Sequence, residues 1–190
     1  MLPCGCAIGR HPRWPSQCQN DHDLLSVIRP VSDCGTVEFR PALTREAQTM
    51  AEMSRELVET GLGWRYTPTR MAALISDPET VALVAYEAPH IRGLAVMQFG
   101  EERGHLALLC VDPEQHRRGI GRRMIEWLVQ SAQVAGLVSI ELELRADNLA
   151  ALAFYRRLAF SETQLVPGYY SGRIAARRMV RLLGRDAEAS

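Results

Sequence analysis

The segment Val111–Arg123 constrains the fold of this chain more than any other, because it must pass directly from a strand into a helix. An apolar run ends at Val111, and Pro113 stops strand pairing because proline has no backbone N–H. Gly119 and Gly121 then open an amphipathic helix, and glycine lets the backbone approach a bulky group closely. The free N–H groups of the first helical turn suit an anion such as a pyrophosphate. The alternative is a plain helix start with a solvated run of arginines.

Two widespread phosphate-binding motifs do not fit this segment. A dinucleotide-binding fingerprint fails because its third glycine position holds Met124. A P-loop fails because it needs a lysine, and all 22 basic residues of the chain are arginine. The lack of lysine also excludes enzymes that form a Schiff base with their own lysine side chain.

Length and charge narrow the class of protein further. With 190 residues, 47% of them hydrophobic, the chain suits one domain with one sizeable core. Its formal net charge is zero, so no molecule-wide field gathers nucleic acid or anionic membrane, and we expect neither as a partner. No apolar run approaches the roughly 20 residues of a membrane span. We therefore expect a cytoplasmic protein that is a monomer or a homodimer.

The N-terminal stretch differs from the rest of the chain in composition. Residues 1–34 hold Gly, Pro, Cys and His without periodicity, which predicts a flexible extension before a folded domain at 35–184 and a tail at 185–190. Four of the five cysteines lie in or at the end of this stretch: Cys4, Cys6, Cys18 and Cys34. Zinc binding is one interpretation, but the spacings match no common zinc finger, and we expect free thiols and no metal.

Hydrophobic periodicity predicts strands and helices in the order βααβββαβαββ. The predicted strands cover about 36–40, 80–86, 91–99, 105–111, 138–145, 159–169 and 174–183, and the predicted helices about 44–58, 68–76, 119–135 and 148–158. Short links make the three strands between 80 and 111 an antiparallel meander. The sequence thus predicts an α+β fold of three layers, a mixed and mostly antiparallel twisted sheet with helices on both faces.

Three of these elements also show which side chains they bury. The predicted apolar stripe of the helix near 44–58 is Ala47, Met50, Ala51, Leu57 and Val58, and that of the helix near 119–135 is Ile120, Met124, Ile125, Leu128, Val129 and Ala132. In the strand near 138–145, Val138, Ile140, Leu142 and Leu144 are predicted to point one way and Ser139, Glu141, Glu143 and Arg145 the other.

The run from Leu108 to Phe160 resembles the acetyl-CoA-binding core of the GNAT superfamily of N-acetyltransferases. Their signature, Gln/Arg-x-x-Gly-x-Gly/Ala, follows a strand, and His116 stands here at its first position. The resemblance implies acetyl-CoA as co-substrate, with its pyrophosphate held by main-chain amides, so we expect the substitution to be tolerated. The implied amide donors are His116, Arg117, Arg118, Gly119, Ile120, Gly121 and Arg122.

The same resemblance implies a bulge that splays the fourth and fifth strands and opens a slot for the pantetheine. The matching residues are Leu109, Cys110 and Val111, and the Cys110 thiol itself is expected to be buried filler.

A second segment, Asn148 to Phe160, resembles the family pattern Asn-x-x-Ala-x-x-x-Tyr-x-x-x-Gly-Phe, with Ala159 in place of the glycine. Asn148 and Tyr155 lie seven residues apart, or two helical turns, so one helix edge can hold both against the cofactor. A phenol with a pKa near 10 can give the departing thiolate its proton. Tyr155 is therefore predicted as a catalytic residue, and a core tyrosine is the alternative.

The strand before Asn148 supplies the candidate base. It resembles the RimI-like subfamily, N-terminal acetyltransferases of ribosomal protein, in which a glutamate at the position of Glu143 helps to deprotonate the amine. Glu141, by contrast, is expected to be merely solvated. The pair Tyr169 and Tyr170 resembles one that the subfamily places at its peptide cleft, with packing on the sheet as the alternative.

The sequence constrains the identity of the amine acceptor less than that of the acetyl donor. The Gly-rich segment 61–66 between the first two helices carries Trp64 and Tyr66, which we expect to contact the substrate. Arg177 and Arg178 fit either an acidic partner or a charged edge strand. Neutralising an α-amine at pH 7 costs about 1.4 kcal/mol and a lysine about 4.6 kcal/mol, which favours a protein N-terminus. A small amine such as a polyamine, amino acid or antibiotic, and a non-catalytic acyl-CoA-binding regulatory module, are the alternatives.

Overall fold

The computed structural model of the chain describes residues 37–170 and 172–184. The predicted extension at 1–34, with its four cysteines, and the predicted tail at 185–190 lie outside the described residues. Within the described part, no three His, Cys, Asp or Glu side chains come together in a way that could hold a metal ion. None of the described helices combines the length and the apolar composition that crossing a membrane requires.

Seven strands form one sheet in the order β1-β2-β3-β4-β5-β7-β6. All neighbouring pairs are antiparallel except β4 and β5, which run parallel. The strands are β1 Glu38–Pro41, β2 Thr80–Glu87, β3 His90–Phe99, β4 Arg103–Val111, β5 Ser139–Arg145, β6 Ser161–Tyr170 and β7 Ile174–Leu182. The predicted element order and α+β class are confirmed.

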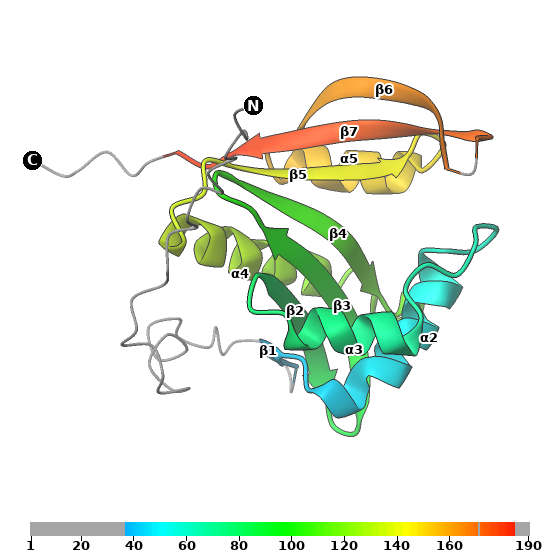
Figure 1. Ribbon diagram of the computed structural model, residues 1–190, viewed down its shortest axis with the longest axis vertical. Helices are drawn as coiled ribbons and strands as arrows, with labels where there is room; N and C mark the ends of the chain where they lie inside the picture. The colour runs from blue at the N-terminus through cyan, green and yellow to red at the C-terminus, as the bar shows by residue number, and fades with distance from the viewer. Residues whose placement is uncertain (1–36, 171, 185–190) are drawn as a thin grey trace, which may run out of the picture. The chain divides into compact units, whose positions relative to one another are not determined.

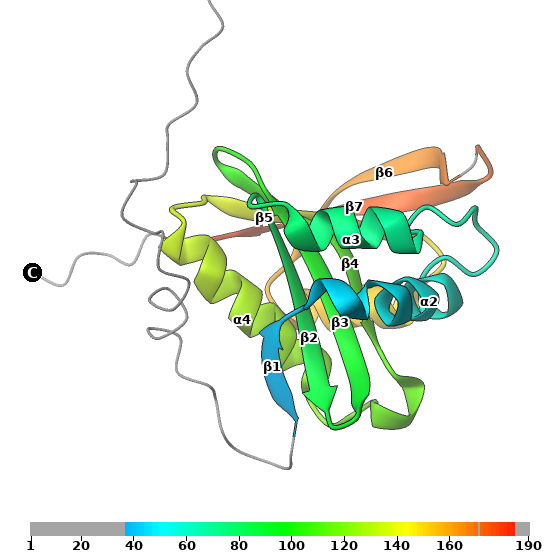
Figure 2. The ribbon, with the colours of Figure 1, turned by 60° about the horizontal axis from the view of Figure 1, so that its bottom comes forward.

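In the part of the chain that the structure describes, four helices cover the two faces of this sheet (Figure 1). Their bounds are α2 Ala47–Leu57, α3 Pro68–Ser76, α4 Ile120–Val134 and α5 Leu149–Arg157, with short 3₁₀ turns η1 Thr44–Glu46 and η2 Pro113–Gln115. In Figure 2, α2 and α3 lie in front of β2 to β4. Their side chains form one core with those strands, while α4 and α5 form the other core on the opposite face. Helices on both faces are therefore confirmed.

The buried stripe of α4 matches the prediction residue by residue, but two other apolar assignments are wrong. Leu57 is 38% exposed, because the buried stripe of α2 ends one turn earlier at Ser54. Val138 is 41% exposed, because β5 begins only at Ser139 and leaves Val138 in the link from α4. Ser139 is buried instead, so the predicted alternation holds only from Ile140 onward.

The feature of the sheet that positions the site is a split between its two parallel strands. The pairing of β4 with β5 ends at His105 and Glu141. Just beyond, the register between β3 and β4 shifts so that Ala107 is an extra residue in β4, which is a β-bulge. Figure 1 shows β4 and β5 diverging beyond this point. The bulge and the splay that the resemblance implied are both present.

Candidate active site

The turn between β4 and α4 takes a backbone shape that only some residues adopt easily. Asp112 accepts a hydrogen bond from the backbone N–H of Glu114 at 3.0 Å and so caps η2. Arg117 then has φ +65° and Gly119 has φ +77°, both in the left-handed region. Gly119 is the N-cap of α4, and glycine adopts this conformation without the strain of a Cβ. The sequence therefore needs glycine at 119 for conformation.

This turn leaves a row of backbone donors free. Within the described residues, no group accepts a hydrogen bond from the backbone N–H of any residue from 117 to 122. The next amide, of Arg123, donates to the Gly119 carbonyl at 3.0 Å and starts the helical pattern. Six consecutive free amides at the N-terminus of a fifteen-residue helix form a site for an anion.

The side chains of the turn are occupied with neighbours. The Arg118 guanidinium contacts Gln115 and lies 3.6 Å from the Glu87 carboxylate. Arg122 pairs with Glu126 at 2.7 Å. The groups of the turn that are available to an anion are therefore mainly its backbone N–H groups.

His116, at the first signature position, folds back onto the turn. Its Nε2 lies 3.0 Å from the Val111 carbonyl oxygen, so the imidazole holds the end of β4 against the turn. This contact explains how a histidine can stand at this position without disturbing the amides.

The room for a side chain at position 121 is limited. A Cβ built on it would lie 3.4 Å from the Phe154 ring and 3.6 Å from the Val111 side chain. A methyl group would fit at ordinary contact distance, whereas a longer side chain would have to avoid Phe154 and Val111.

The edge of β4 that faces the gap offers a second set of backbone groups. The N–H of Asp112 donates to the Arg92 carbonyl of β3 at 2.8 Å, and Cys110 lies opposite Leu94 of the same strand. Because backbone groups alternate in direction along a strand, those of Leu109 and Val111 face the gap and those of Cys110 face β3.

Cys110 therefore contributes less to the slot than its neighbours. Its side chain is 8% exposed and belongs to the core beneath α2 and α3. Burial raises the pKa of the thiol to about 12, so the group stays protonated. The predicted role of Cys110 as buried filler matches this placement.

Tyr155 projects from α5 into the core on the α4 side of the sheet. The residue is 8% exposed, and its ring packs edge-on against Phe154 and Phe160 with centroids 5.2 and 5.4 Å away. Burial raises the pKa of the phenol far above its usual range, and the Cys110 thiol and Tyr170 phenol raise it further. The phenol is therefore protonated throughout the neutral pH range.

Asn148 precedes α5 instead of lying within it. Its Oδ1 accepts a hydrogen bond from the Ala151 N–H at 3.0 Å, which makes it the N-cap of the helix. The predicted helix start at 148 is corrected to Leu149, because the cap residue leaves the helical conformation. Contact of Asn148 with the cofactor stays a prediction.

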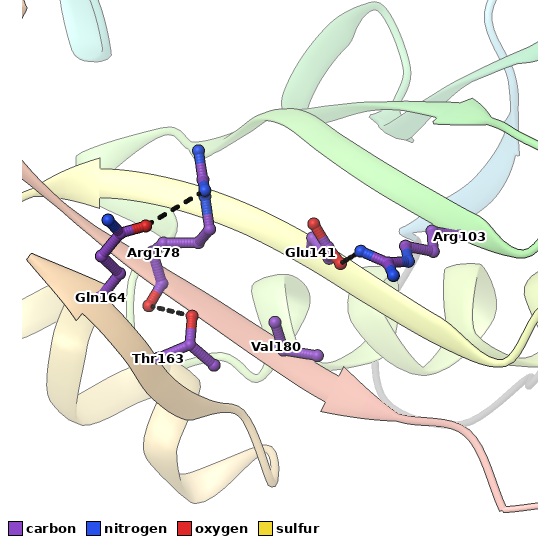
Figure 3. A pocket seen from close by; sticks show the side chains of 6 residues that line it. All are labelled: Arg103, Glu141, Thr163, Gln164, Arg178 and Val180. Carbon is purple, nitrogen blue, oxygen red and sulfur yellow. Dashed lines mark hydrogen bonds and ion pairs between the residues drawn. The ribbon is translucent and has the colours of Figure 1, made fainter. Parts of the chain in front are cut away.

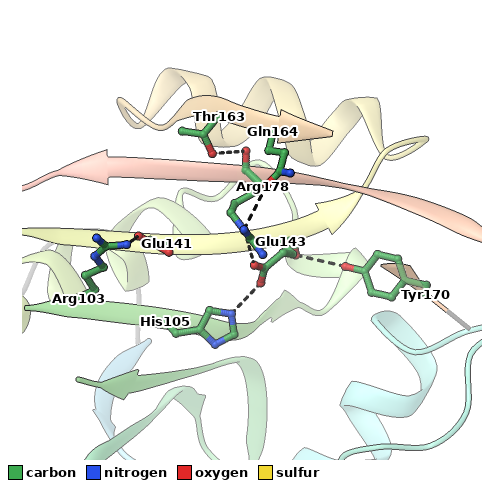
Figure 4. A network of polar contacts seen from close by, with 8 residues as sticks. All are labelled: Arg103, His105, Glu141, Glu143, Thr163, Gln164, Tyr170 and Arg178. Atoms are coloured by element: carbon green, nitrogen blue, oxygen red, sulfur yellow. Dashed lines mark hydrogen bonds and ion pairs between the residues drawn. The ribbon is translucent and has the colours of Figure 1, made fainter. Parts of the chain in front are cut away.

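Glu143 sits at the centre of a polar network on the opposite face of β5 (Figure 4). Its Oε2 lies 2.8 Å from His105 Nε2, and its Oε1 accepts from Arg178 Nε at 3.0 Å. These two contacts lower the pKa of the Glu143 carboxyl despite its partial burial. The Tyr170 hydroxyl donates to the Glu143 carbonyl at 3.3 Å, so β4, β5, β6 and β7 meet here.

Sequence reasoning did not single out His105, and it did not connect Arg178 with Glu143. The pairing depends on the register of β4 against β5 and of β5 against β7, in which Glu143 lies opposite Arg178. From sequence, Arg178 fitted either an acidic partner or a charged edge strand, and neither interpretation connects it with Glu143.

The edge-strand interpretation of the arginines in β7 is wrong. Arg178 is engaged by Glu143, and Arg177 is engaged by Glu162 at 2.7 Å and by the Ala146 carbonyl at 3.3 Å. Both already have partners within the chain. Neither residue lies on an edge strand, because β7 runs between β5 and β6.

Beside this network the sheet surface is hollowed into a depression of about 340 Å³ (Figure 3). It is lined by Arg103, Glu141, Thr163, Gln164, Arg178 and Val180. Glu141, expected to be solvated, is 25% exposed at its side chain and pairs with Arg103 at 2.9 Å. Arg178 reaches from Glu143 to the Gln164 side chain at 3.3 Å and so joins the network to the depression.

The segment between α2 and α3 is held in place by Glu59. Its carboxylate is 5% exposed and accepts from the backbone N–H of Arg65 at 2.6 Å and of Tyr66 at 3.3 Å. Arg145 of β5 donates to the Thr60 carbonyl at 3.3 Å. The segment is thereby tied to the strand that carries Glu143.

The four predicted substrate-contacting aromatics differ in exposure. Trp64 is 36% exposed with Arg55 stacked 4.7 Å from its ring, and Tyr169 is 40% exposed. Tyr66 packs at the margin of the α2 and α3 core, and burial raises its phenol pKa. Tyr169 and Tyr170 pack edge-on at 4.9 Å. Trp64 and Tyr169 thus offer open surface, while Tyr66 and Tyr170 support them.

Comparison with known proteins agrees with this geometry. The acetyltransferase (GNAT) family profile matches residues 47–160. The [ribosomal protein bS18]-alanine N-acetyltransferase of Salmonella typhimurium is 38% identical over 76 residues, which is 40% of this chain and 51% of that protein. The chain thus spans about half the length of that relative.

Two further similarities extend over more of the chain. The N-alpha-acetyltransferase RimI of Mycobacterium tuberculosis is 33% identical over 134 residues, covering 68% of this chain and 82% of that protein. The crystal structure of the ribosomal-protein-S18-alanine N-acetyltransferase from Escherichia coli superposes with a TM-score of 0.69 at 22% identity, over 81% of this chain and 98% of that one. The fold is therefore shared across nearly the whole of that enzyme.

Proposed function

The chain belongs to the acetyltransferase (GNAT) family, and we propose on that basis that it transfers the acetyl group of acetyl-CoA to the α-amine at a protein N-terminus. The observation that carries the proposal is the row of six free amides after the end of β4, the strand that separates from β5, together with the buried and protonated Tyr155. The named activities of the two sequence relatives, both N-acetyltransferases, support the acceptor class.

The donor side of the site fits acetyl-CoA. The free amides at 117–122 suit its pyrophosphate, because each N–H lacks another acceptor within the described residues. The outward backbone groups of Leu109 and the outward N–H of Val111 suit the amide groups of pantetheine, which would extend β4 as a strand does. The Val111 carbonyl oxygen already contacts His116 Nε2. Acetyl-CoA supplies an activated acyl group, and the chain supplies position and proton transfer.

Tyr155 and the Glu143 network divide the proton transfers between them. Tyr155, kept protonated by burial, donates to the departing sulfur. The network of Glu143, His105 and Arg178 lies on the other face of β5 and takes the proton that the amine must lose. An α-amine with a pKa near 8 needs only about 1.4 kcal/mol for this loss at pH 7, which a modest base supplies.

The acceptor approaches from the face that carries Trp64 and Tyr169. Both side chains are open to solvent, and the segment 59–66 and the β6–β7 hairpin that bear them flank the end of β5. Large aromatic side chains of this kind anchor a peptide by apolar contact. We assign Trp64, Tyr66, Tyr169 and Tyr170 to the acceptor side. We further propose that the protein is cytoplasmic and works as a monomer or homodimer.

Acetylation assays decide between the acceptor classes. The chain is incubated with acetyl-CoA and a panel of peptides that differ in their first residue, and in parallel with polyamines, amino acids and aminoglycosides. Acetylation of peptide α-amines is the expected result. Activity confined to small amines would contradict the protein acceptor, and acetyl-CoA binding without acetylation of any amine would show a non-catalytic module.

A further inference from the structure

We infer that His105 is the residue that accepts the proton of the incoming amine, and that Glu143 and Arg178 position it. The inference rests on the proposed acetyltransferase activity and assigns the base of that same site. It differs from the role that sequence resemblance implied, in which Glu143 itself acts on the amine.

Glu143 is poorly placed to meet an amine. Both of its carboxylate oxygens are engaged, one by Arg178 at 3.0 Å and one by His105 at 2.8 Å. Its side chain is only 11% exposed, whereas that of His105 is 45% exposed. The group of this network that a substrate can reach is the imidazole.

The contact with Glu143 also sets the tautomer of His105. An ionised carboxylate can only accept a hydrogen bond, so Nε2 of the ring must be the nitrogen that carries the proton. The neutral imidazole then has its lone pair on Nδ1, on the other side of the ring from Glu143. Arg178 keeps the carboxylate ionised and fixed, so the network presents one basic nitrogen in one orientation.

The position of His105 in the sheet suits this role. It forms the last pair between β4 and β5, two residues before the bulge at Ala107 where the strands separate. Its ring reaches diagonally to Glu143, two residues beyond its register partner Glu141 on β5, and Figure 4 shows the ring between β4 and the Glu143 carboxylate. The imidazole therefore stands on the acceptor face where the gap begins.

His105 and Tyr155 together account for every proton that moves in the reaction. The acceptor arrives as an ammonium, and His105 Nδ1 takes one proton and releases it to solvent. The neutral nitrogen bonds to the thioester carbonyl carbon as the C–S bond breaks and sulfur leaves with the electron pair. Tyr155 donates its proton to that sulfur and recovers one from the new amide nitrogen. The products are the acetylamide, coenzyme A and one proton.

The test separates a base from a structural residue. In His105→Gln the side-chain amide can still donate to Glu143 but offers no basic nitrogen. We expect kcat to fall about 100-fold, with acetyl-CoA affinity and peptide KM unchanged within about twofold. Arg103→Gln, two residues earlier on the same strand and 67% exposed at its side chain, is the matched control and keeps full activity.

Chemical rescue adds a readout that a structural role would not move. In His105→Ala, added imidazole should restore activity about tenfold, because the site is open to solvent and the lost group is a base. Full activity of His105→Gln, or failure of imidazole to restore His105→Ala, would overturn the assignment. A wild-type protein that acetylates no amine would instead refute the proposed function, so the two failures are distinct.

Discussion

Two regions of the candidate site use different chemical groups. We call residues 111–122 the donor turn, and we call the side chains of His105, Glu143, Tyr169, Tyr170 and Arg178 the acceptor face. The donor turn offers backbone N–H groups that follow from two left-handed residues and a helix N-terminus close together in sequence. The acceptor face offers side chains that four strands bring together from positions up to 73 residues apart, since His105 and Arg178 meet at one carboxylate. One region depends on local conformation and the other on register.

Backbone sites and side-chain sites achieve specificity in different ways. A backbone site recognises what every acyl-CoA shares and tolerates changes of side chain, as His116 shows. A side-chain site depends on individual side chains, such as Arg178, which engages Glu143. In the proposed assignment, the fold determines how the donor is bound, and a few side chains determine how the acceptor is bound.

The largest effect should come from placing a charge in the donor turn. In Gly121→Glu a carboxylate would stand over the free amides, repel the pyrophosphate and crowd Phe154, from which a Cβ is 3.4 Å away. We expect acetyl-CoA affinity measured by calorimetry to fall at least about 100-fold, or roughly 2.7 kcal/mol. Gly121→Ala is the control and keeps affinity, because a methyl group fits there. Unchanged binding in Gly121→Glu would remove the pyrophosphate from this turn.

Tyr155→Phe should separate rate from binding. The phenylalanine keeps the edge-on packing with Phe154 and Phe160 but loses the proton donor. We expect kcat to fall about 100-fold, with acetyl-CoA affinity and thermal stability close to those of the wild type. A variant with full kcat would reduce Tyr155 to a core tyrosine, which was the alternative from sequence.

The donor turn was predictable from sequence because its determinants are adjacent. Pro113, Gly119 and Gly121 dictate the end of the strand and the start of the helix wherever the turn occurs. The apolar stripe of α4 was predictable for the same reason, since one helix face sets its spacing. Local rules therefore gave the element order and the anion-binding amides.

The acceptor face was only partly predictable because its determinants are distant. Glu143 could be named, but its contacts with His105 and Arg178 depend on which residues pair across β4, β5 and β7. An edge strand was one of the two interpretations of the arginines in β7, since the chain gives no local sign that β6 returns outside β7. Strand order is a property of the whole sheet, and single-strand patterns do not contain it.

A smaller effect should appear at the open aromatic surface of the acceptor side. Removing the exposed ring in Trp64→Ala should raise the peptide KM about fivefold, or roughly 1 kcal/mol, and leave acetyl-CoA affinity unchanged. Val134→Ala removes a side chain that is even more exposed, at the far end of α4, and serves as the control. A KM that responds equally to both changes would show that Trp64 has no specific contact with the acceptor.

The smallest effect concerns stability in acid, and it contrasts the two regions directly. His105 and Arg178 lower the pKa of Glu143 below its ordinary value of 4.5, so the unfolded chain takes up a proton first as pH falls. The stabilisation from this carboxylate is present above that value and is lost as pH falls through the lowered pKa. Because Arg178 is partly exposed, the loss is at most about 1 kcal/mol. Urea unfolding at pH 7 and pH 3.5 should show a smaller decline in Glu143→Gln than in the wild type. Gly121→Ala lies in the donor turn, outside this network, and its free energy of unfolding should decline as that of the wild type does. Equal declines in the wild type, Glu143→Gln and Gly121→Ala would mean that the network contributes nothing to stability.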